Sequence, residues 1–258
     1  MTPPPGPPET APQPATHSFS VRLPTQPVRV TYVFLALIGL VFAAQFGFEA
    51  LLGYDPILVL GAKVNELIAE GQVWRLLTAV FIHASVLHIA FNAYALYNLG
   101  AQVETFYGPL RFSLLYLLAG LSGSVASLIF SPAPSVGASG AIFGLIGAMA
   151  VLLYRNRRVF GERGRRSLQS IIVIALINLA IGLQGGIDNW AHFGGLVGGL
   201  LLGWAIGPVW ALPEQPALAL GPITLEDQQP LTLPRWLGVS AFAVALAALT
   251  GLGVSLQR

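Results

Sequence analysis

Seven strongly apolar stretches, separated by more polar segments, organise this chain. They cover residues 30–52, 82–103, 111–130, 139–154, 168–184, 189–208 and 235–256. Most approach the ~20 consecutive apolar residues that a membrane-spanning helix needs, and the fourth is the shortest. The pattern predicts an all-α, polytopic membrane protein, in which six helices form a core and a seventh transmembrane helix is added at the C-terminus.

Polar and proline-rich segments divide the chain into four parts. Residues 1–28 are rich in Pro and Thr, and this composition predicts a disordered cytoplasmic tail. Residues 29–210 contain the predicted six-span core. Residues 211–234 contain three acidic side chains and several prolines, which is typical of a linker, here cytoplasmic, and residues 235–258 contain the additional span.

The composition agrees with a membrane environment. Hydrophobic residues make up 55% of the chain and charged residues 9%, against ~25% charged in soluble domains, so there are too few charges to cover a water-exposed surface. The mean hydropathy is +0.71. A net charge of +2 gives no extended basic face, so nucleic acid is not an expected partner. Because there is no cysteine, disulfides and thiolate metal sites are excluded.

A cluster of arginines predicts the orientation in the membrane. The connection between the fourth and fifth stretches contains Arg155, Arg157, Arg158, Arg163, Arg165 and Arg166. The positive-inside rule places this connection in the cytoplasm, and alternation then places the N-terminus inside and the C-terminus outside. The predicted location is the plasma membrane, with several passes.

The fourth stretch is too short to cross a membrane in full. A helix from Gly140 to about Tyr154 has ~15 residues and covers roughly 22 Å of a ~30 Å hydrocarbon core. Ser139 would then lie below the outer surface. Irregular backbone at that depth, such as residues 131–135, is tolerated only where protein buries it or a wet cavity adjoins it. The sequence therefore predicts an outward-facing, water-filled cavity at Ser139.

Two interpretations of Ser139 follow from its own segment. In one, Ser139 belongs to a run of small residues with Gly137, Gly140 and Gly144, which lets membrane helices approach closely. In the other, Ser139 is a nucleophile at a helix N-terminus, where free N–H groups and the helix dipole stabilise an oxyanion. Because a serine hydroxyl is a weak nucleophile without a base, the second interpretation requires a base within reach.

His192 is the predicted base, since it begins the sixth stretch on the same outer side as Ser139. Gly195 and Gly199 follow three and seven residues later on the same helical face. Packing of these glycines on those of the fourth stretch would bring His192 beside Ser139. The alternative is an interfacial histidine with a packing role. Asp188 is expected to cap this helix, although its spacing of four residues from His192 also allows a third member of a triad.

Three further polar residues, His83, His88 and Asn92, occupy the outer part of the second stretch. His88 and Asn92 are four residues apart and share a helical face, whereas His83 and His88 are about 140° apart on a helix. This arrangement is poor for a single metal ion unless His83 lies before the helix, and no metal site is predicted. Beside a serine, these side chains suit hydrogen bonding to a tetrahedral intermediate. The alternative is a buried structural network.

Together these residues resemble the rhomboid family of intramembrane serine proteases. The similarity extends over about residues 74–200, plus the first span. The residues that carry it are Trp74 and Arg75, then His83, His88 and Asn92 in H-x4-H-x3-N spacing, Glu104, Gly137, Ser139, Gly140 and Gly144, and His192 with Gly195 and Gly199. The resemblance implies a rhomboid-like core, no cofactor, and substrates that are transmembrane proteins in the lipid bilayer.

The resemblance also implies roles for the catalytic residues. Ser139 matches the nucleophile and His192 the general base, so that the two form a Ser-His dyad. His88 and Asn92, with the backbone N–H of Ser139, match the oxyanion hole. Phe143 occupies the place of an aromatic residue that packs against the catalytic histidine.

Other matched residues have structural roles in the family. Trp74 and Arg75 match a motif of the first outer loop, and Glu104 matches a structural polar residue near the cytoplasmic end of the second span. The fifth span, residues 168–184, with the loop 184–187 after it, is the expected gate over the site.

The sequence therefore predicts a serine endopeptidase that cuts transmembrane proteins near the outer face of the membrane. Two other classes stay open, as does the oligomeric state. A transporter could use the histidines as a proton relay, but this gives no reason for a serine on a glycine-flanked turn. A catalytically silent relative could bind membrane proteins without cutting them, although silent relatives generally lose the dyad.

Overall fold

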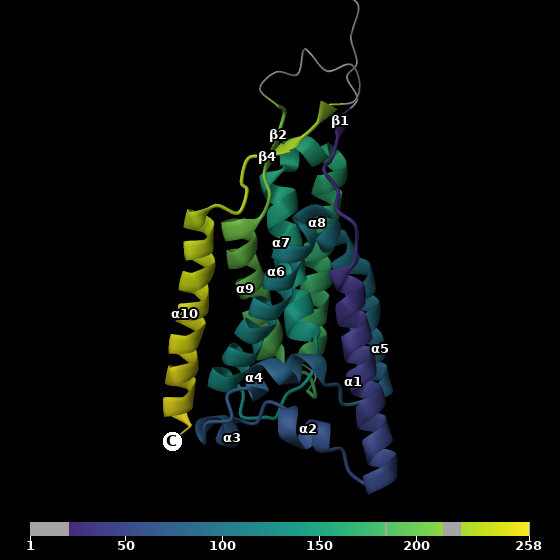
Figure 1. Ribbon diagram of the computed structural model, residues 1–258, viewed down its shortest axis with the longest axis vertical. Coiled ribbons are helices and arrows are strands. Elements are labelled where there is room, and N and C mark those ends of the chain that lie inside the picture. The colour runs from purple at the N-terminus through teal and green to yellow at the C-terminus, as the bar shows by residue number, and fades with distance from the viewer. Residues whose placement is uncertain (1–20, 184, 214–222, 258) are drawn as a thin grey trace, which may run out of the picture.

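Helices make up nearly all of the regular structure (Figure 1). The structure is a computed structural model that describes residues 21–183, 185–213 and 223–257. Its elements are β1 (Val21–Arg22), α1 (Val30–Leu52), α2 (Pro56–Gly61), α3 (Asn65–Ala69), α4 (Arg75–Thr78), the 3-10 helix η1 (Ala79–Phe81), α5 (Val86–Ala95), the π-helix η2 (Leu96–Gly100), α6 (Ala101–Phe130), α7 (Ser139–Arg155), α8 (Arg157–Gly182), α9 (Asn189–Ile206), β2 (Trp210–Ala211), β3 (Ile223–Thr224), β4 (Glu226–Asp227) and α10 (Leu233–Leu256).

Four helices of the described chain are long and apolar enough to cross a membrane: α1, the continuous run Val86–Phe130, α8 and α10. The run Val86–Phe130 has 45 residues, and a straight helix of that length would be ~67 Å long, about twice the hydrocarbon thickness. It breaks at Gly108, whose φ of 75° and ψ of 167° reverse the chain. The prediction of an all-α, polytopic chain is confirmed, and the count of seven spans stays a prediction.

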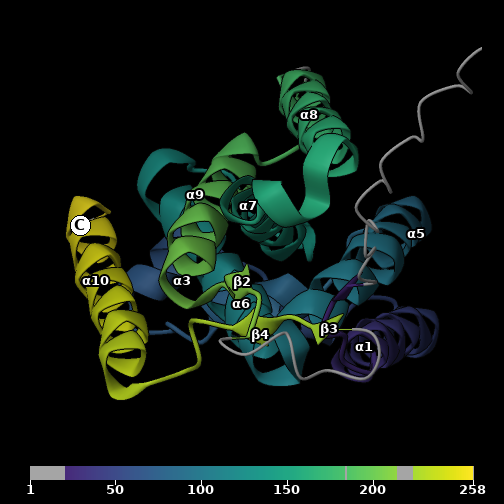
Figure 2. The same ribbon diagram turned by 90° about the horizontal axis from the view of Figure 1, so that it is seen from above.

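The helix α7 lies inside the bundle, with α6, α8 and α9 around it (Figure 2). Every residue from Gly140 to Met149 is buried. The helices α1 and α5 lie on one side of this centre, and α10 packs against α6 and α9 on the opposite side (Figures 1 and 2). The short helices α2 to α4 form a layer at the end of the bundle where α1 ends (Figure 1).

Glycines bring the backbones of α7 and α9 into contact. A Cβ atom built on Gly199 would lie 1.9 Å from the carbonyl oxygen of Gly144, and one on Gly195 would lie 2.0 Å from that of Gly140. No larger residue fits at these positions without separating the helices. The two glycine stripes that the sequence shows therefore face each other, as expected.

The second helix begins later than the apolar stretch 82–103 predicts. It begins at Val86, because the hydroxyl of Ser85 accepts a hydrogen bond of 3.2 Å from the N–H of His88 and caps the helix. His83 consequently lies in irregular backbone before the helix. The helical angle between His83 and His88, on which the expectation of no metal site partly rested, therefore does not apply.

The predicted fifth span, residues 168–184, is the second half of a longer helix. The helix α8 begins at Arg157 and has a non-helical residue at Gly161, with φ 53° and ψ −141°. Its first turns contain five of the six arginines of the predicted cytoplasmic connection, and the sixth, Arg155, ends α7. Gln184, the last residue of the predicted span, lies outside the described residues.

Two short strand pairs form at the end of the bundle where α1 begins. The strand β1 pairs in parallel with β3, and β2 pairs antiparallel with β4. Of the tail predicted to be disordered, residues 1–20 lie outside the described residues, and β1 belongs to the remainder. The predicted linker 211–234 supplies β3 and β4, and its residues 214–222 lie outside the described chain.

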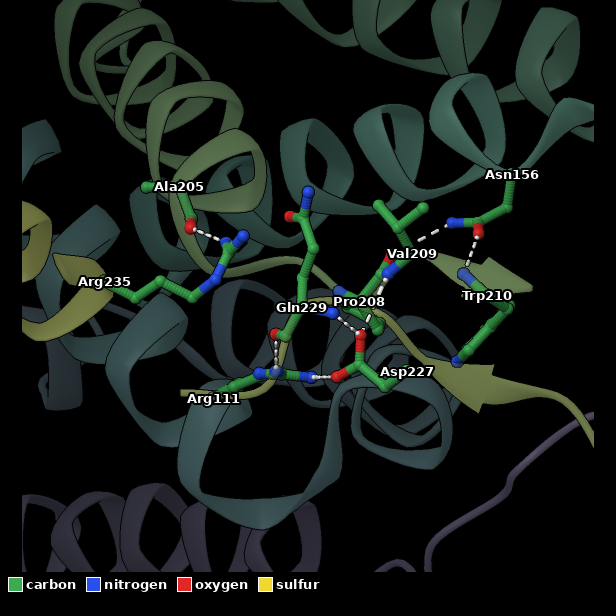
Figure 3. Close-up of polar contacts among 9 residues, drawn as sticks. All are labelled: Arg111, Asn156, Ala205, Pro208, Val209, Trp210, Asp227, Gln229 and Arg235. Atoms are coloured by element: carbon green, nitrogen blue, oxygen red, sulfur yellow. Dashed lines mark hydrogen bonds and ion pairs between the residues drawn. The ribbon is translucent and has the colours of Figure 1, made fainter. Parts of the chain in front are cut away.

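Polar contacts attach the linker to the helix ends (Figure 3). The guanidinium group of Arg111, in α6, forms an ion pair of 2.8 Å with Asp227. The side-chain oxygen of Asn156, between α7 and α8, accepts a hydrogen bond of 2.8 Å from the N–H of Trp210. Arg235, in α10, donates to the carbonyl oxygen of Ala205 in α9. These contacts fix the start of α10 against the core.

Candidate active site

The hydroxyl of Ser139 and the ring of His192 meet where α7 and α9 begin. The distance between Ser139 Oγ and His192 Nε2 is 2.9 Å, although the two residues are 53 positions apart. His192 is buried, with 8% of its surface exposed. The ring of Phe143, one turn along α7, stacks on the imidazole with centroids 4.3 Å apart and planes at 12°. Ser139 and His192 thus form a hydrogen-bonded pair in a sheltered site.

Asp188 is the N-cap of α9. One of its carboxylate oxygens accepts a hydrogen bond of 3.0 Å from the N–H of Ala191, and the other accepts one from the hydroxyl of Ser127. In the described chain, His192 Nδ1 is buried and has no hydrogen-bond partner. The geometry is therefore that of a two-residue pair, with Asp188 in the capping position.

His88 lies against the turn that leads to Ser139. A Cβ atom on Gly137 would lie 2.6 Å from His88 Nε2, and the φ of Gly137 is +122°, which side chains other than that of glycine rarely adopt. The buried Asn92, one turn further along α5, donates a hydrogen bond of 2.9 Å to the carbonyl oxygen of His88. The ring of His83 packs edge-on against that of His88, with centroids 5.1 Å apart. Of the predicted oxyanion residues, His88 therefore adjoins the serine turn, whereas the amide of Asn92 bonds within its own helix.

Trp74 and Arg75 organise the layer of short helices. Arg75 is 2% exposed, and its guanidinium group donates hydrogen bonds of 2.9 Å to the carbonyl oxygens of Val59 and Ala62. The indole N–H of Trp74 donates to the carbonyl oxygen of Leu60 at 3.2 Å. Both side chains therefore satisfy carbonyl groups at the C-terminal end of α2, an end that a short helix cannot satisfy by itself.

Glu104 caps a helix that is not its own. Its carboxylate accepts hydrogen bonds from the backbone N–H groups of Arg29, Val30 and Thr31 at 2.8 to 2.9 Å, and from the Thr31 hydroxyl at 2.7 Å. These are N–H groups that the first turn of α1 leaves without helical partners. A negative charge is also favourable at that end of the helix dipole. Glu104 thereby joins α6 to the start of α1.

Sequence reasoning missed Lys63, which fixes the loop before Ser139. Its ammonium group donates hydrogen bonds to the carbonyl oxygens of Ser131 and Ala133 at 2.8 and 3.0 Å, and its backbone pairs with Ser135. Burial lowers the pKa of Lys63 to about 8, against the opposing effect of Asp188. The available signal was a lysine inside the apolar segment 57–64.

A second missed residue is Gln45, in the middle of the apolar stretch 30–52. It is 4% exposed, and its amide forms hydrogen bonds with both the C=O and the N–H of His83. An isolated amide in a membrane span was the signal that could have found it, because such groups are costly unless paired. No group of three or more His, Cys, Asp or Glu side chains in the described ranges is placed to hold a metal ion.

The fold and the Ser-His pair define a class of helical membrane proteins with a serine site inside the bundle. A family model described as the Rhomboid domain matches residues 70–209, more than half of the chain. The chain belongs to the rhomboid family, and it is an integral membrane protein. The matched range contains Trp74, Arg75 and all the predicted site residues that follow them.

Curated relatives agree with this assignment. The chain is 46% identical to "Rhomboid protease GluP" of Bacillus subtilis (strain 168) over 178 residues, which are 69% of this chain and 34% of that protein. It is 39% identical to "RHOMBOID-like protein 1" of Arabidopsis thaliana over 172 residues, which are 63% of this chain and 44% of that protein. The matches thus span a third to a half of the relatives' length.

Proposed function

We propose that this protein is an intramembrane serine endopeptidase that cuts transmembrane proteins near the outer face of the membrane. The observation that carries the proposal is the 2.9 Å contact between Ser139 Oγ and His192 Nε2 at the starts of two helices. Membership of the rhomboid family and the similarity to a protein named as a protease support it. A nucleophile activated by an adjacent base is the arrangement that acyl transfer needs.

The proposed reaction uses side-chain and backbone groups of this chain, a substrate and water. His192 Nε2 takes the hydroxyl proton of Ser139 as Oγ attacks the peptide carbonyl, and the C–N bond then breaks as His192 returns the proton to the amine. Water, deprotonated by His192, hydrolyses the resulting ester and restores Ser139. The backbone N–H of Ser139 and the side chains of Asn92 and His88 would hold the oxyanion in each tetrahedral intermediate.

Two neighbours support this chemistry. The stacked ring of Phe143 limits the rotation of the imidazole, so that Nε2 stays directed at Ser139. The second half of α8 has mostly exposed side chains, with Ala175 as one of its few buried residues. This helix, which buries few of its side chains against the rest of the protein, is the proposed gate through which a transmembrane substrate enters from the bilayer. In the proposed orientation, the arginine-rich start of α8 and the strand pairs lie in the cytoplasm, the C-terminus lies outside, and the membrane is the plasma membrane.

The decisive experiment compares Ser139→Ala and His192→Ala with the wild type. The purified proteins in detergent are given a labelled transmembrane substrate and, separately, a serine-reactive fluorophosphonate probe. Each variant should lose cleavage and probe labelling. Ser139→Ala should keep its melting temperature, because it removes only a hydroxyl, whereas His192→Ala should fold with a lower one, because it removes the ring stacked on Phe143. Ser113→Ala, which removes a hydroxyl bonded within α6, is the matched control and should cleave normally.

The outcomes separate the proposed function from its rivals. Wild-type turnover by either dyad variant would overturn the dyad. A wild type that binds transmembrane proteins but neither cleaves them nor reacts with the probe would identify a catalytically silent relative. Proton-coupled transport without cleavage would point to a histidine relay instead.

A further inference from the structure

Gln45 uses every part of its side-chain amide inside the membrane-spanning helix α1. Its Nε2 donates hydrogen bonds to the Asp55 carboxylate at 2.7 Å and to the carbonyl oxygen of His83 at 3.2 Å. Its Oε1 accepts one of 3.1 Å from the N–H of His83. Leaving such an amide without hydrogen bonds in an apolar environment costs roughly 2 to 7 kcal/mol, so these contacts are strongly favoured.

Asp55 fixes which way the amide of Gln45 points. Its Oδ1 accepts hydrogen bonds from the N–H groups of Ile57 and Leu58 at 2.9 and 3.1 Å and caps α2, which leaves Oδ2 for Gln45. A carboxylate oxygen accepts and does not donate, so it selects the NH₂ side of the amide. The oxygen of Gln45 is therefore directed to the N–H of His83.

The backbone of His83 has this amide as its partner because no regular element supplies one. His83 lies between η1 and α5, in irregular chain. Gln45 satisfies both its N–H and its C=O, as a neighbouring strand would. One side chain of α1 thus ties the backbone of His83 to that helix.

Contacts continue from His83 to the serine turn. The ring of His83 packs on that of His88, and the ring of His88 fills the space beside the Cα of Gly137. The N–H of Gly137 donates a hydrogen bond of 2.8 Å to the carbonyl oxygen of Ala79, which ties the turn to η1. Ser139 follows two residues later. Movement of His83 would therefore displace the ring of His88 relative to Ser139.

We infer that Gln45 is a positioning residue, which holds the His83 backbone so that His88 lies beside the turn that carries Ser139. The inference rests on the proposed function for its effect on catalysis, because His88 is a proposed oxyanion donor. Gln45 itself touches no reacting atom. Its removal should lower the rate of the chemical step and change substrate binding little, since a displacement of ~1 Å near a reaction can cost ~10² in rate.

The test replaces Gln45 by methionine, which keeps the length of the side chain and removes the amide. The matched control is Gln102→Met, because Gln102 is exposed and its amide bonds only within its own helix run, to the carbonyl oxygen of Asn98. For Gln45→Met we expect kcat to fall by roughly tenfold to a hundredfold, less than the ~10² to 10³ for loss of an oxyanion donor, with KM within about threefold. Gln102→Met should leave both constants unchanged.

A double-mutant cycle separates positioning from general destabilisation. In a His88→Ala background, Gln45→Met should lower kcat by less than about twofold, because the side chain through which it acts is gone. Independent, additive losses in kcat would overturn the inference. So would a Gln45→Met protein with the kcat of the Gln102→Met control.

Hydrogen–deuterium exchange tests the same contacts without any turnover. Backbone amides of residues 82–89 should exchange at least severalfold faster in Gln45→Met than in the wild type or the Gln102→Met control. Unchanged exchange there would overturn the inference even if the wild type were inactive. If the wild type neither cleaved substrate nor reacted with the probe, only the proposed function would be contradicted. The exchange rates would still decide whether Gln45 holds residues 82–89 in place.

Discussion

The two helices that flank α7 differ in how they are attached. The helix α9 touches α7 backbone to backbone through Gly195 and Gly199. The helix α8 buries little more than Gly164, Ala175 and Gly182 along its 26 residues. The pair of side chains at 2.9 Å thus lies between two helices in backbone contact, whereas the helix beside the site buries few of its residues.

The physical cause of this difference between α8 and α9 is that the helices are surrounded by lipid. Lipid tails are as apolar as leucine side chains, so burial of apolar surface does little to hold membrane helices together. Close packing and dispersion must do so, and both grow when glycine lets backbones approach. A helix with large, exposed apolar side chains, such as Ile174, Leu176 and Ile177 in α8, gains about as much from lipid as from protein.

The largest effect should come from breaking the close contact. Gly199→Val places a side chain where a Cβ already lies 1.9 Å from the carbonyl oxygen of Gly144, so α7 and α9 must separate. We expect a loss of several kcal/mol, on the order of 3 or more, and no cleavage. Melting temperature in detergent and cleavage of a labelled substrate measure both effects.

Gly251→Val is the matched control for this prediction. Gly251 is in α10, and a Cβ there would meet nothing within 4 Å. Its substitution should change stability by no more than about 0.5 kcal/mol, as is usual at surface positions. Equal losses at Gly199 and Gly251 would contradict the view that the contact between α7 and α9 is special.

Lys63→Met should also lower the stability of the protein, but by less than Gly199→Val. It leaves the carbonyl oxygen of Ala133 without its donor, while that of Ser131 keeps the amide of Asn65, and this costs about 1 to 3 kcal/mol near neutral pH. The loop before Ser139 should then exchange hydrogen faster, and the melting temperature should fall.

The contribution of Lys63 to pH dependence has a definite sign. Because burial lowers its pKa to about 8 from 10.5, the unfolded chain binds more protons between these values, and this group adds stability as the pH rises through that window. This added stability is lost as the pH falls through about 8. The melting temperature of the wild type, relative to Lys63→Met, should therefore increase from pH 7 to pH 10.5. An opposite trend would show that burial does not control this lysine.

Asp188 tests whether the Ser-His pair depends on a third group. Asp188→Ala removes the cap of α9 and should cost ~1 kcal/mol of stability, whereas Asp188→Asn keeps a cap of similar quality. Activity of Asp188→Asn should stay within about tenfold. A true triad aspartate loses ~10⁴ in kcat on this change, so a loss of that size at constant melting temperature would make Asp188 a catalytic partner of His192.

The smallest effect on stability is expected at the loose side. The side chain of Asn189 donates a hydrogen bond of 2.9 Å to the carbonyl oxygen of Leu179 and so joins the end of α8 to the start of α9. Asn189→Ala should cost less than about 1 kcal/mol and speed amide exchange in residues 179–183. Cleavage should be as fast as in the wild type or up to about threefold faster if α8 opening limits the rate. Slower exchange there would contradict the loose attachment of α8.

Local patterns in the sequence determined much of this protein. Apolar length predicted the helices, with α1 placed at residues 30–52, and glycine spacing predicted the faces of α7 and α9 that meet. The positions of Ser139 and His192 at the outer starts of two apolar stretches with glycine stripes indicated them as a pair. These features could be predicted because helical periodicity and the cost of polar groups in lipid act within a few turns of one segment.

Only the tertiary structure decided which distant groups satisfy each other. Glu104 caps α1 across more than 70 positions, Gln45 holds His83 across 38, and the N-terminal strand β1 pairs with β3. None of these partnerships leaves a periodic signal, because a donor can form a hydrogen bond with any acceptor that the fold brings within about 3 Å. The sequence specified which groups need partners, and the packing of the helices selected the partners.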